Sequence, residues 1–269
     1  MKKIIFIIFF LSGCLGLLLI KPSFAQMFLE QGKVSLVITP GENITGELVV
    51  HNTTDQEIQL NAYWEDFIYK APFDGTKEFI PAGTSDYSLA SWVHFSPQDF
   101  TISPYGKKKI SYIFNVPQNI SGGYYGVLFL EKEATPLKGK RGVNVVTRVG
   151  GLFFLESVNQ KKEAVLENIT ISSQSLQADF INTGDVILIP QGIFYVLSED
   201  GRVVDRGEIE TIYIPPGQKA SYQMVFNNDF SIGKYTLVAT IDLQQDNVLV
   251  KEIDFEKKDV SINILTIRD

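Results

Sequence analysis

The histidines and paired carboxylates are the residues whose types could support catalysis, but their spacing does not. His51 and His94 are far apart, and neither has the i+2 or i+4 partner of a metal site. Carboxylates pair at Glu65–Asp66 and at Glu131 with Glu133, on strand ends or edges. Glycoside hydrolysis needs two carboxyls facing across a cleft at about 5–9.5 Å, which nothing here implies. Serines lack a G-x-S-x-G context. We therefore predict no catalytic residue, no metal site, no cofactor and no enzyme.

The stretch NISGGYYGVLFLEKE (119–133) places two glycines before two tyrosines and an apolar run. Aromatic rings beside a flexible loop can stack on sugars, as Trp64 and Trp92 also could. A sandwich core, however, needs a large buried aromatic, and Trp64 lies in an alternating run, so we assign it a structural role. Gly123 is assigned to the turn that leads into the strand. Tyr125 is the one residue of this stretch predicted to face a ligand.

Composition indicates a packed, acidic protein. Of 269 residues, 45% are apolar and 20% charged, which favours a folded core over disorder. The formal net charge is −7. Without residues 1–25, which hold three lysines and no acid, 21 basic residues oppose 31 acidic ones, a charge of −10. Nucleic acid and anionic membrane surfaces would repel such a chain, so neither is predicted as a partner.

The first 25 residues have the pattern of an export signal. Lys2 and Lys3 precede the apolar run Ile4–Ile20, and small residues lead to Ala25, where we expect cleavage. An uncleaved anchor is a further alternative, because the run approaches the length of about 20 residues that spans a bilayer. No later segment is apolar and long enough to do so. The protein is predicted to be exported, to the periplasm or the cell surface.

Cys14 is the only cysteine, and it allows a second interpretation of the signal. The residues LSGC (11–14) fit a lipoprotein signal in which Cys14 is lipidated, although the apolar LGLLLI that follows is not a typical polar tether. Simple secretion is ranked above lipidation, and lipidation above an anchor. If cleavage follows Ala25, the mature chain has no thiol and therefore no disulfide.

Short strand-like runs separated by Gly, Pro and Asn indicate an all-β fold. The runs cover 33–39, 45–52, 57–67, 107–117, 124–133 and 143–157, and helical periodicity is nearly absent. The stretch 70–103 is less regular and is expected to be a long excursion. Runs of this length and composition predict immunoglobulin-like β-sandwiches.

An internal repeat divides the chain into two such domains. Residues 102–130 resemble residues 213–241, each with Pro and Gly, an alternating strand, a loop with Gly, then a Tyr and an apolar strand. The offset of about 110 residues matches one sandwich domain of about 100 residues. We predict a signal peptide at 1–25, a first domain at 26–158 and a second at 162–269, with the boundary in the polar stretch VNQKKEA.

Four motifs carry a resemblance to a known family, in the order SLVITPGENITGELVVHNTTDQEIQL, WVHFSPQDFTISPYGKKKISYIFNVP, GGYYGVLFLEKE and RGVNVVTRVGGLFFLE. They resemble the first immunoglobulin-like domain of the WxL-interacting cell-surface proteins. They are similar, more distantly, to the first domain of periplasmic pilus chaperones. The second domain resembles its family counterpart in FINTGDVILIPQGIFYVLSEDGRVV and IPPGQKASYQ. The membrane span and basic tail of the WxL-interacting proteins are not present in this sequence.

The chaperone resemblance implies a partner-binding site. Pilus chaperones hold a subunit's C-terminal carboxylate with two basic residues in the interdomain cleft and lend the subunit a strand. Lys33 and Arg148 lie roughly where such residues would be, although a basic residue on a strand is more often solvated. An edge strand at 143–157 would also present Val145 and Val149 to a partner.

Two further features of the repeat are assigned structural roles. Gly150 and Gly151 indicate a bulge or a close approach of the backbone in the last strand of the first domain. Tyr124 and Tyr235 occupy corresponding places, and each is a candidate for a tyrosine corner, in which the hydroxyl bonds to upstream backbone.

Our main interpretation is an exported, non-enzymatic binding protein of the envelope or cell surface. Its sandwich surfaces would engage a protein or a cell-wall polymer, as an adhesion module does. The alternative is a periplasmic pilus-type assembly chaperone that acts by β-strand addition. The sequence does not define the partner or the oligomeric state.

Overall fold

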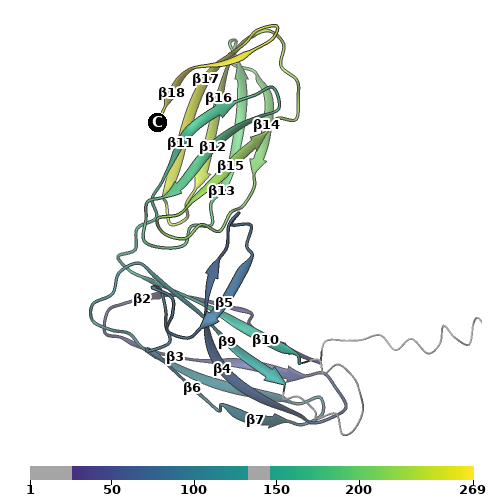
Figure 1. Ribbon diagram of the computed structural model, residues 1–269, viewed down its shortest axis with the longest axis vertical. Helices are drawn as coiled ribbons and strands as arrows, with labels where there is room; N and C mark the ends of the chain where they lie inside the picture. Colours follow the sequence, from purple (N-terminus) through teal and green to yellow (C-terminus); the bar gives the residue numbers. More distant parts are fainter. Residues whose placement is uncertain (1–25, 133–145) are drawn as a thin grey trace, which may run out of the picture.

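All regular elements in the described residues, 26–132 and 146–269 of the computed structural model, are β-strands. They form two β-sandwich domains that meet end to end like the arms of an L (Figure 1). The chain passes from the first domain to the second between β10, which ends at Ser157, and β11, which begins at Ala164. The predicted all-β class with two tandem sandwiches is confirmed.

The first domain consists of two facing sheets. One has the strand order β1 (Met27–Leu29), β3 (Asn43–Asn52), β8 (Lys107–Asn115) and β6 (Val93–Ser96). The other has the order β2 (Lys33–Ile38), β10 (Arg148–Ser157), β9 (Gly123–Lys132), β4 (Ile58–Tyr69) and β5 (Lys77–Pro81), with β7 (Asp99–Ile102) also paired to β4. The excursion expected at 70–103 therefore contains three short strands.

The second domain repeats this plan with a smaller and a larger sheet. The smaller has the order β11 (Ala164–Ile171), β12 (Ser175–Asn182) and β15 (Lys219–Val225). The larger has the order β14 (Val203–Ile209), β13 (Gln191–Ser198), β16 (Gly233–Asp242), β17 (Val248–Lys257) and β18 (Ile262–Arg268).

The repeat seen in the sequence corresponds to one structural device in each domain. Asn52 and Asn182 are both buried at a strand end. The Asn52 amide donates to backbone carbonyls that include Ile102, and the Asn182 amide donates to the carbonyls of Val186 and Ile214. Each side-chain oxygen also accepts a backbone N–H two residues on. Both asparagines thus fasten the loop after their own strand to the segment that precedes the paired strand, β8 or β15.

Alternation along the strands separates two cores. Leu60 and Trp64 of β4 belong to the core of the first domain, whereas Phe67 and Tyr69 of the same strand belong to a cluster that continues into the second domain. Trp64 packs at 5.3 Å from the Phe153 ring centroid. The outward face of the larger sheet of the first domain is therefore covered, at one end, by the second domain.

The joint between the domains is closely fitted. The Tyr125 hydroxyl accepts a hydrogen bond from the Ile187 N–H at 2.8 Å, and the Gly123 N–H donates to the Asp185 carbonyl at 3.0 Å. Gly122 has φ of +70°, and a Cβ there would lie 2.4 Å from the Asp185 carbonyl oxygen. Lys162 is buried in the joint with Glu156 at 3.2 Å. These contacts leave no room for larger residues at the glycines.

Candidate partner-binding site

The first part of β10 is an open sheet edge. β9 pairs with β10 from Arg148 onward, but β2 covers the other side only from Leu152 to Ser157. The Thr147 carbonyl accepts from Lys132, and the Leu152 N–H donates to Gly32 on the opposite side. Because successive residues point to alternate sides, the backbone groups of Arg148 and Gly150 point away from β9, where no described strand pairs with them.

Lys33 stands at the point where this open edge ends. It is the first residue of β2 and lies beside Leu152 in the register of the two strands. Its ammonium group is 4.4 Å from the centroid of the Phe154 ring. Lys33 also lines a groove between the domains, together with residues of β2 and β10 and with Ile187, Ile189, Gln244 and Gln245 of the second domain.

Lys77 is a second cation near this groove, and sequence reasoning did not find it. It begins β5, inside the stretch that was expected to be irregular. Its Nζ lies 4.7 Å from the Tyr69 ring centroid and donates to the Gly75 carbonyl at 3.2 Å. Burial and the nearby charge of Lys33 lower the pKa of Lys77. The alternating residues KEFIP after a glycine turn could have indicated the strand. They could not have indicated that its hairpin extends to the second domain.

Arg148 is on the same face of the sheet as Lys33, but unlike Lys33 it has a carboxylate partner. It donates to the Tyr63 hydroxyl at 3.0 Å and pairs with Glu65 at 3.4 Å, and its guanidinium lies 3.9 Å from the Phe129 centroid. These contacts raise the pKa of Arg148. Lys33 therefore lies beside Leu152, where the covered part of β10 begins, whereas Arg148 lies at the far end of the open edge.

Tyr125 is not exposed to a ligand, contrary to the prediction. Its side chain is 2% exposed, and the ring packs between the domains at 5.4 Å from Phe154. Burial, as the largest cause, strongly raises the pKa of its hydroxyl. Alternation explains the difference, since the face of β9 that holds Tyr125 is the face that the second domain covers.

The other predicted residues divide by role. Tyr235 donates from its hydroxyl to the Ser231 carbonyl at 2.9 Å, an upstream bond of the tyrosine-corner type. Tyr124 instead packs on Trp92 at 4.3 Å. The pairing of β10 with β9 runs without a register shift through Gly150 and Gly151. A Cβ on Gly151 would lie 2.9 Å from Leu48, so the approach there is close. Cys14 and Val145 lie outside the described residues, and Val149 is half-buried beside the open edge.

The carboxylates and histidines form no catalytic arrangement in the described ranges. Asp66 is fully buried and accepts hydrogen bonds from the backbone of Thr84 and Ser85, while Glu65 points to the opposite face of β4. His51 contacts Glu30 at 2.6 Å. Within the part of the chain that the structure covers, no three His, Cys, Asp or Glu residues gather as metal ligands. No helix there is long and apolar enough to cross a bilayer.

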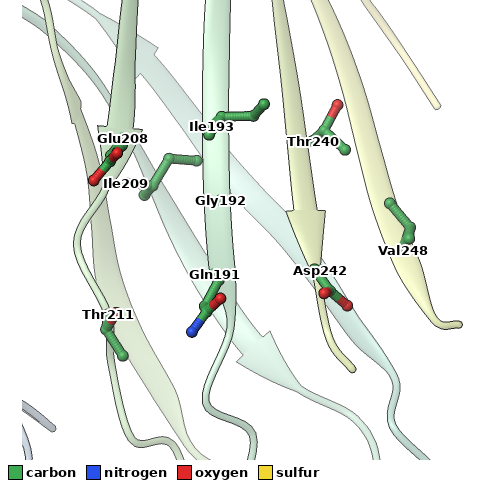
Figure 2. A pocket seen from close by; sticks show the side chains of 9 residues that line it. All are labelled: Gln191, Gly192, Ile193, Glu208, Ile209, Thr211, Thr240, Asp242 and Val248. Atoms are coloured by element: carbon green, nitrogen blue, oxygen red, sulfur yellow. The ribbon is translucent and has the colours of Figure 1, made fainter. Parts of the chain in front are cut away.

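A separate hollow lies on the second domain. Figure 2 shows side chains of β13, β14, β16 and β17 around it, with Ile193 and Val248 as apolar residues and Glu208 and Asp242 as acidic ones. It shares no residue with the groove at Lys33. Its side chains offer no nucleophile with an adjacent base, so we assign it no chemistry.

Comparison with solved structures identifies the class of fold. The class 5 fimbriae chaperone CfaA is similar with a TM-score of 0.52 and 12% identity, over 83% of this chain and 97% of that one. A chain of the chaperone–tip adhesin complex of CFA/I fimbriae biogenesis is similar with a TM-score of 0.51 and 14% identity, over 84% and 97%. The chain therefore has the two-domain fold of fimbrial chaperones.

Sequence comparisons add no family. No protein-family profile and no curated protein sequence matches the chain. The structural neighbours agree with the more distant of the two expected resemblances, to pilus chaperones, and lend no support to the WxL-interacting proteins.

Proposed function

We propose that this protein is an exported assembly chaperone that holds an extended strand of a pilus-type subunit against β10. This was the alternative interpretation of the sequence, and the fold favours it over a wall-binding adhesion module. The signal segment supports export to the periplasm. The protein binds by surface complementarity and performs no covalent chemistry.

One observation carries the proposal: the open edge of β10 leads directly to a cation without a counter-ion. Of the ion pairs among the described residues, none includes Lys33. In an acidic protein, a cation without a partner at a groove favours an anionic ligand. An unpaired strand edge favours an extended backbone.

The register and the charge of Lys33 together favour one direction for the bound strand. A strand added beside Arg148–Gly151 occupies the line that β2 takes farther along β10, so one of its ends meets Lys33. If the strand runs parallel to β10, that end is its C-terminus, and its α-carboxylate reaches the Lys33 ammonium. Antiparallel addition would instead bring an ammonium group to Lys33, which charge repulsion disfavours.

The proposal is tested with a fluorescent peptide of alternating Val and Thr, about ten residues long, the length of a strand. We compare its free acid with its C-terminal amide by anisotropy. A charge-assisted hydrogen bond contributes about 1.5 kcal/mol or more, so the free acid should bind about tenfold more tightly. Lys33→Ala should reduce this preference by about threefold or more, and Lys108→Ala, which removes an exposed lysine of β8, should keep it.

A peptide N-methylated at alternate residues tests strand addition itself. Methylation removes the donors that an added strand needs, so binding to the wild-type protein should be lost. Equal binding of the methylated peptide, or equal affinity for the acid and the amide, would contradict the proposal.

A further inference from the structure

The β4–β5 hairpin carries a cation of the first domain to an aromatic ring of the second. Figure 1 shows the β4–β5 hairpin extending toward the near end of the second domain. Tyr213 of the second domain stacks on Tyr69 of β4 with centroids 5.0 Å apart. The Lys77 ammonium lies 4.7 Å from the Tyr69 centroid and 5.8 Å from that of Tyr213. Both domains therefore contact Lys77.

The turn of the hairpin is fitted to Tyr213. The Tyr213 N–H donates to the Phe73 carbonyl at 2.8 Å, and the Phe73 side chain is buried in the cluster that joins the domains. Gly75 has φ of +100°, and a Cβ there would lie 3.0 Å from the Tyr213 ring. A side chain at Gly75 would be both strained and crowded. The hairpin and the ring thus form one contact with little freedom.

The two lysines lie on a continuous aromatic floor. Lys33 is over Phe154, Phe154 is 5.5 Å from Phe67, and Phe67 is 5.8 Å from Tyr69, over which Lys77 lies. Burial is the main cause of the lowered pKa of Lys77, and the charge of Lys33 adds to it. Neither forms an ion pair with a carboxylate of the described chain. An anion between them would relieve this repulsion.

We infer that Tyr213 is a positioning residue, which holds Lys77 beside Lys33 so that the two ammonium groups receive one carboxylate. For its ligand, the inference rests on the proposed function. Tyr213 acts through Lys77 and does not itself need to touch the partner. The packing between the domains and the charge of the groove are therefore coupled: if the packing at Tyr213 loosens, Lys77 moves away from the carboxylate.

The test compares Tyr213→Ala with Tyr213→Phe, which keeps the ring, and with Tyr195→Ala, which removes an exposed tyrosine of the same domain. The first readout is the ratio of the affinities for the free-acid and amide peptides described above. Tyr213→Ala should reduce this ratio by about threefold or more, toward that of Lys77→Ala, because one of two charge contacts is lost. Tyr213→Phe and Tyr195→Ala should keep the wild-type ratio.

Two readouts need no ligand. The first is the pKa of Lys77, followed by NMR of dimethylated lysines. The titratable groups that face the Lys77 ammonium are Lys33, Tyr69 and Tyr213. Lys70 and Glu78, which form an ion pair, lie alongside. The pKa of Lys77 should move toward the ordinary lysine value in Tyr213→Ala, since the group leaves both its burial and Lys33. Spin labels at Lys108→Cys and Val203→Cys should give a broader distance distribution in that variant.

The outcomes separate the two proposals. If the wild-type protein does not prefer the free acid, the proposed carboxylate capture fails, whereas an altered Lys77 titration in Tyr213→Ala still supports the positioning role. In the other outcome, the wild-type protein prefers the free acid while Tyr213→Ala leaves that preference, the Lys77 pKa and the distance distribution all unchanged. That result overturns the inference about Tyr213 and leaves the proposed function standing.

Discussion

β10 of the first domain and β17 of the second occupy corresponding places, beside β9 and β16, and differ in how their edges are closed. Each pairs on its second side only after its first four residues: β2 covers β10 from Leu152, and β18 covers β17 from Glu252. The covering strand is parallel in the first domain and antiparallel in the second. Both domains thus present a short unpaired edge followed by a covered one.

The charges beside the two edges differ. In the second domain Lys251 pairs with Asp269, and Arg268 of β18 pairs with Glu252 and Asp254. The chain neutralises its own cations there. In the first domain Lys33, at the head of the covering strand, keeps no such partner in the described chain. The two unpaired edges are thus equally long but differ in charge: the second domain pairs the cations beside its edge, and the first leaves Lys33 without a carboxylate partner in the described chain.

The largest expected effect tests whether the buried asparagine stabilises both domains to the same extent. Asn52→Ala and Asn182→Ala each leave at least two buried or part-buried carbonyls without their donor, which should cost about 2–4 kcal/mol of unfolding free energy. Urea denaturation measures both. Asn263→Ala, an exposed residue of β18, should change stability by about 0.5 kcal/mol or less. A marked difference between Asn52→Ala and Asn182→Ala would break the equivalence of the domains.

A smaller loss of stability distinguishes a hydrogen bond between the domains, at Tyr125, from one within the second domain, at Tyr235. Tyr125→Phe leaves the Ile187 N–H buried without its acceptor, a loss of about 1–3 kcal/mol. Tyr235→Phe frees the carbonyl of exposed Ser231, which water can reach, so about 1 kcal/mol is expected.

Calorimetry distinguishes these two variants further. Tyr125→Phe should uncouple the unfolding of the domains, which appears as a broader or divided transition. Tyr235→Phe should lower the melting temperature without dividing the transition. If both variants behave alike, the bond at Tyr125 does not couple the domains.

The smallest effect concerns the part of β17 that β18 covers in the second domain. Arg268→Ala removes ion pairs at the surface, so it should cost about 1 kcal/mol or less. Arg268 holds the pKa of Asp254 well below its usual range, so the interaction stabilises above the unfolded pKa of about 4 and is lost as pH falls toward the folded value. The wild-type protein should therefore lose more stability than Arg268→Ala between pH 7 and pH 3.

Urea midpoints at the two pH values give this difference. Arg202→Ala, which removes an exposed ion pair to Asp200, is the control and should titrate like the wild-type protein. A wild-type loss no larger than that of Arg268→Ala would mean that β18 is not held by this charge network.

The sequence predicted the strands well because each strand carries its own alternation. The polar and apolar residues of Lys107–Asn115 and Lys219–Val225 already indicate which face is buried. The internal repeat indicated two sandwich domains for the same reason, since turn glycines and tyrosines recur at a nearly constant offset. Local patterns of this kind need no knowledge of distant residues.

The site was less predictable because it depends on contacts between distant segments. Lys33 was proposed from its place on the first strand, whereas Lys77 could be proposed only from a hairpin that contacts Tyr213 of the second domain. Tyr125 was misjudged because alternation shows that a residue faces away from one core, but not that a second domain covers it. Open edges likewise depend on where a covering strand begins.

The hairpin of β4 and β5 has a consequence for the order in which the molecule is made. Tyr69 and Phe73 pack against residues that the ribosome adds much later, around Tyr213. Until that segment exists and folds, the first domain carries an aromatic surface that has nothing to cover it, and such surfaces promote aggregation. The newly made chain therefore passes through an aggregation-prone stage, which ends only when its second half folds onto its first.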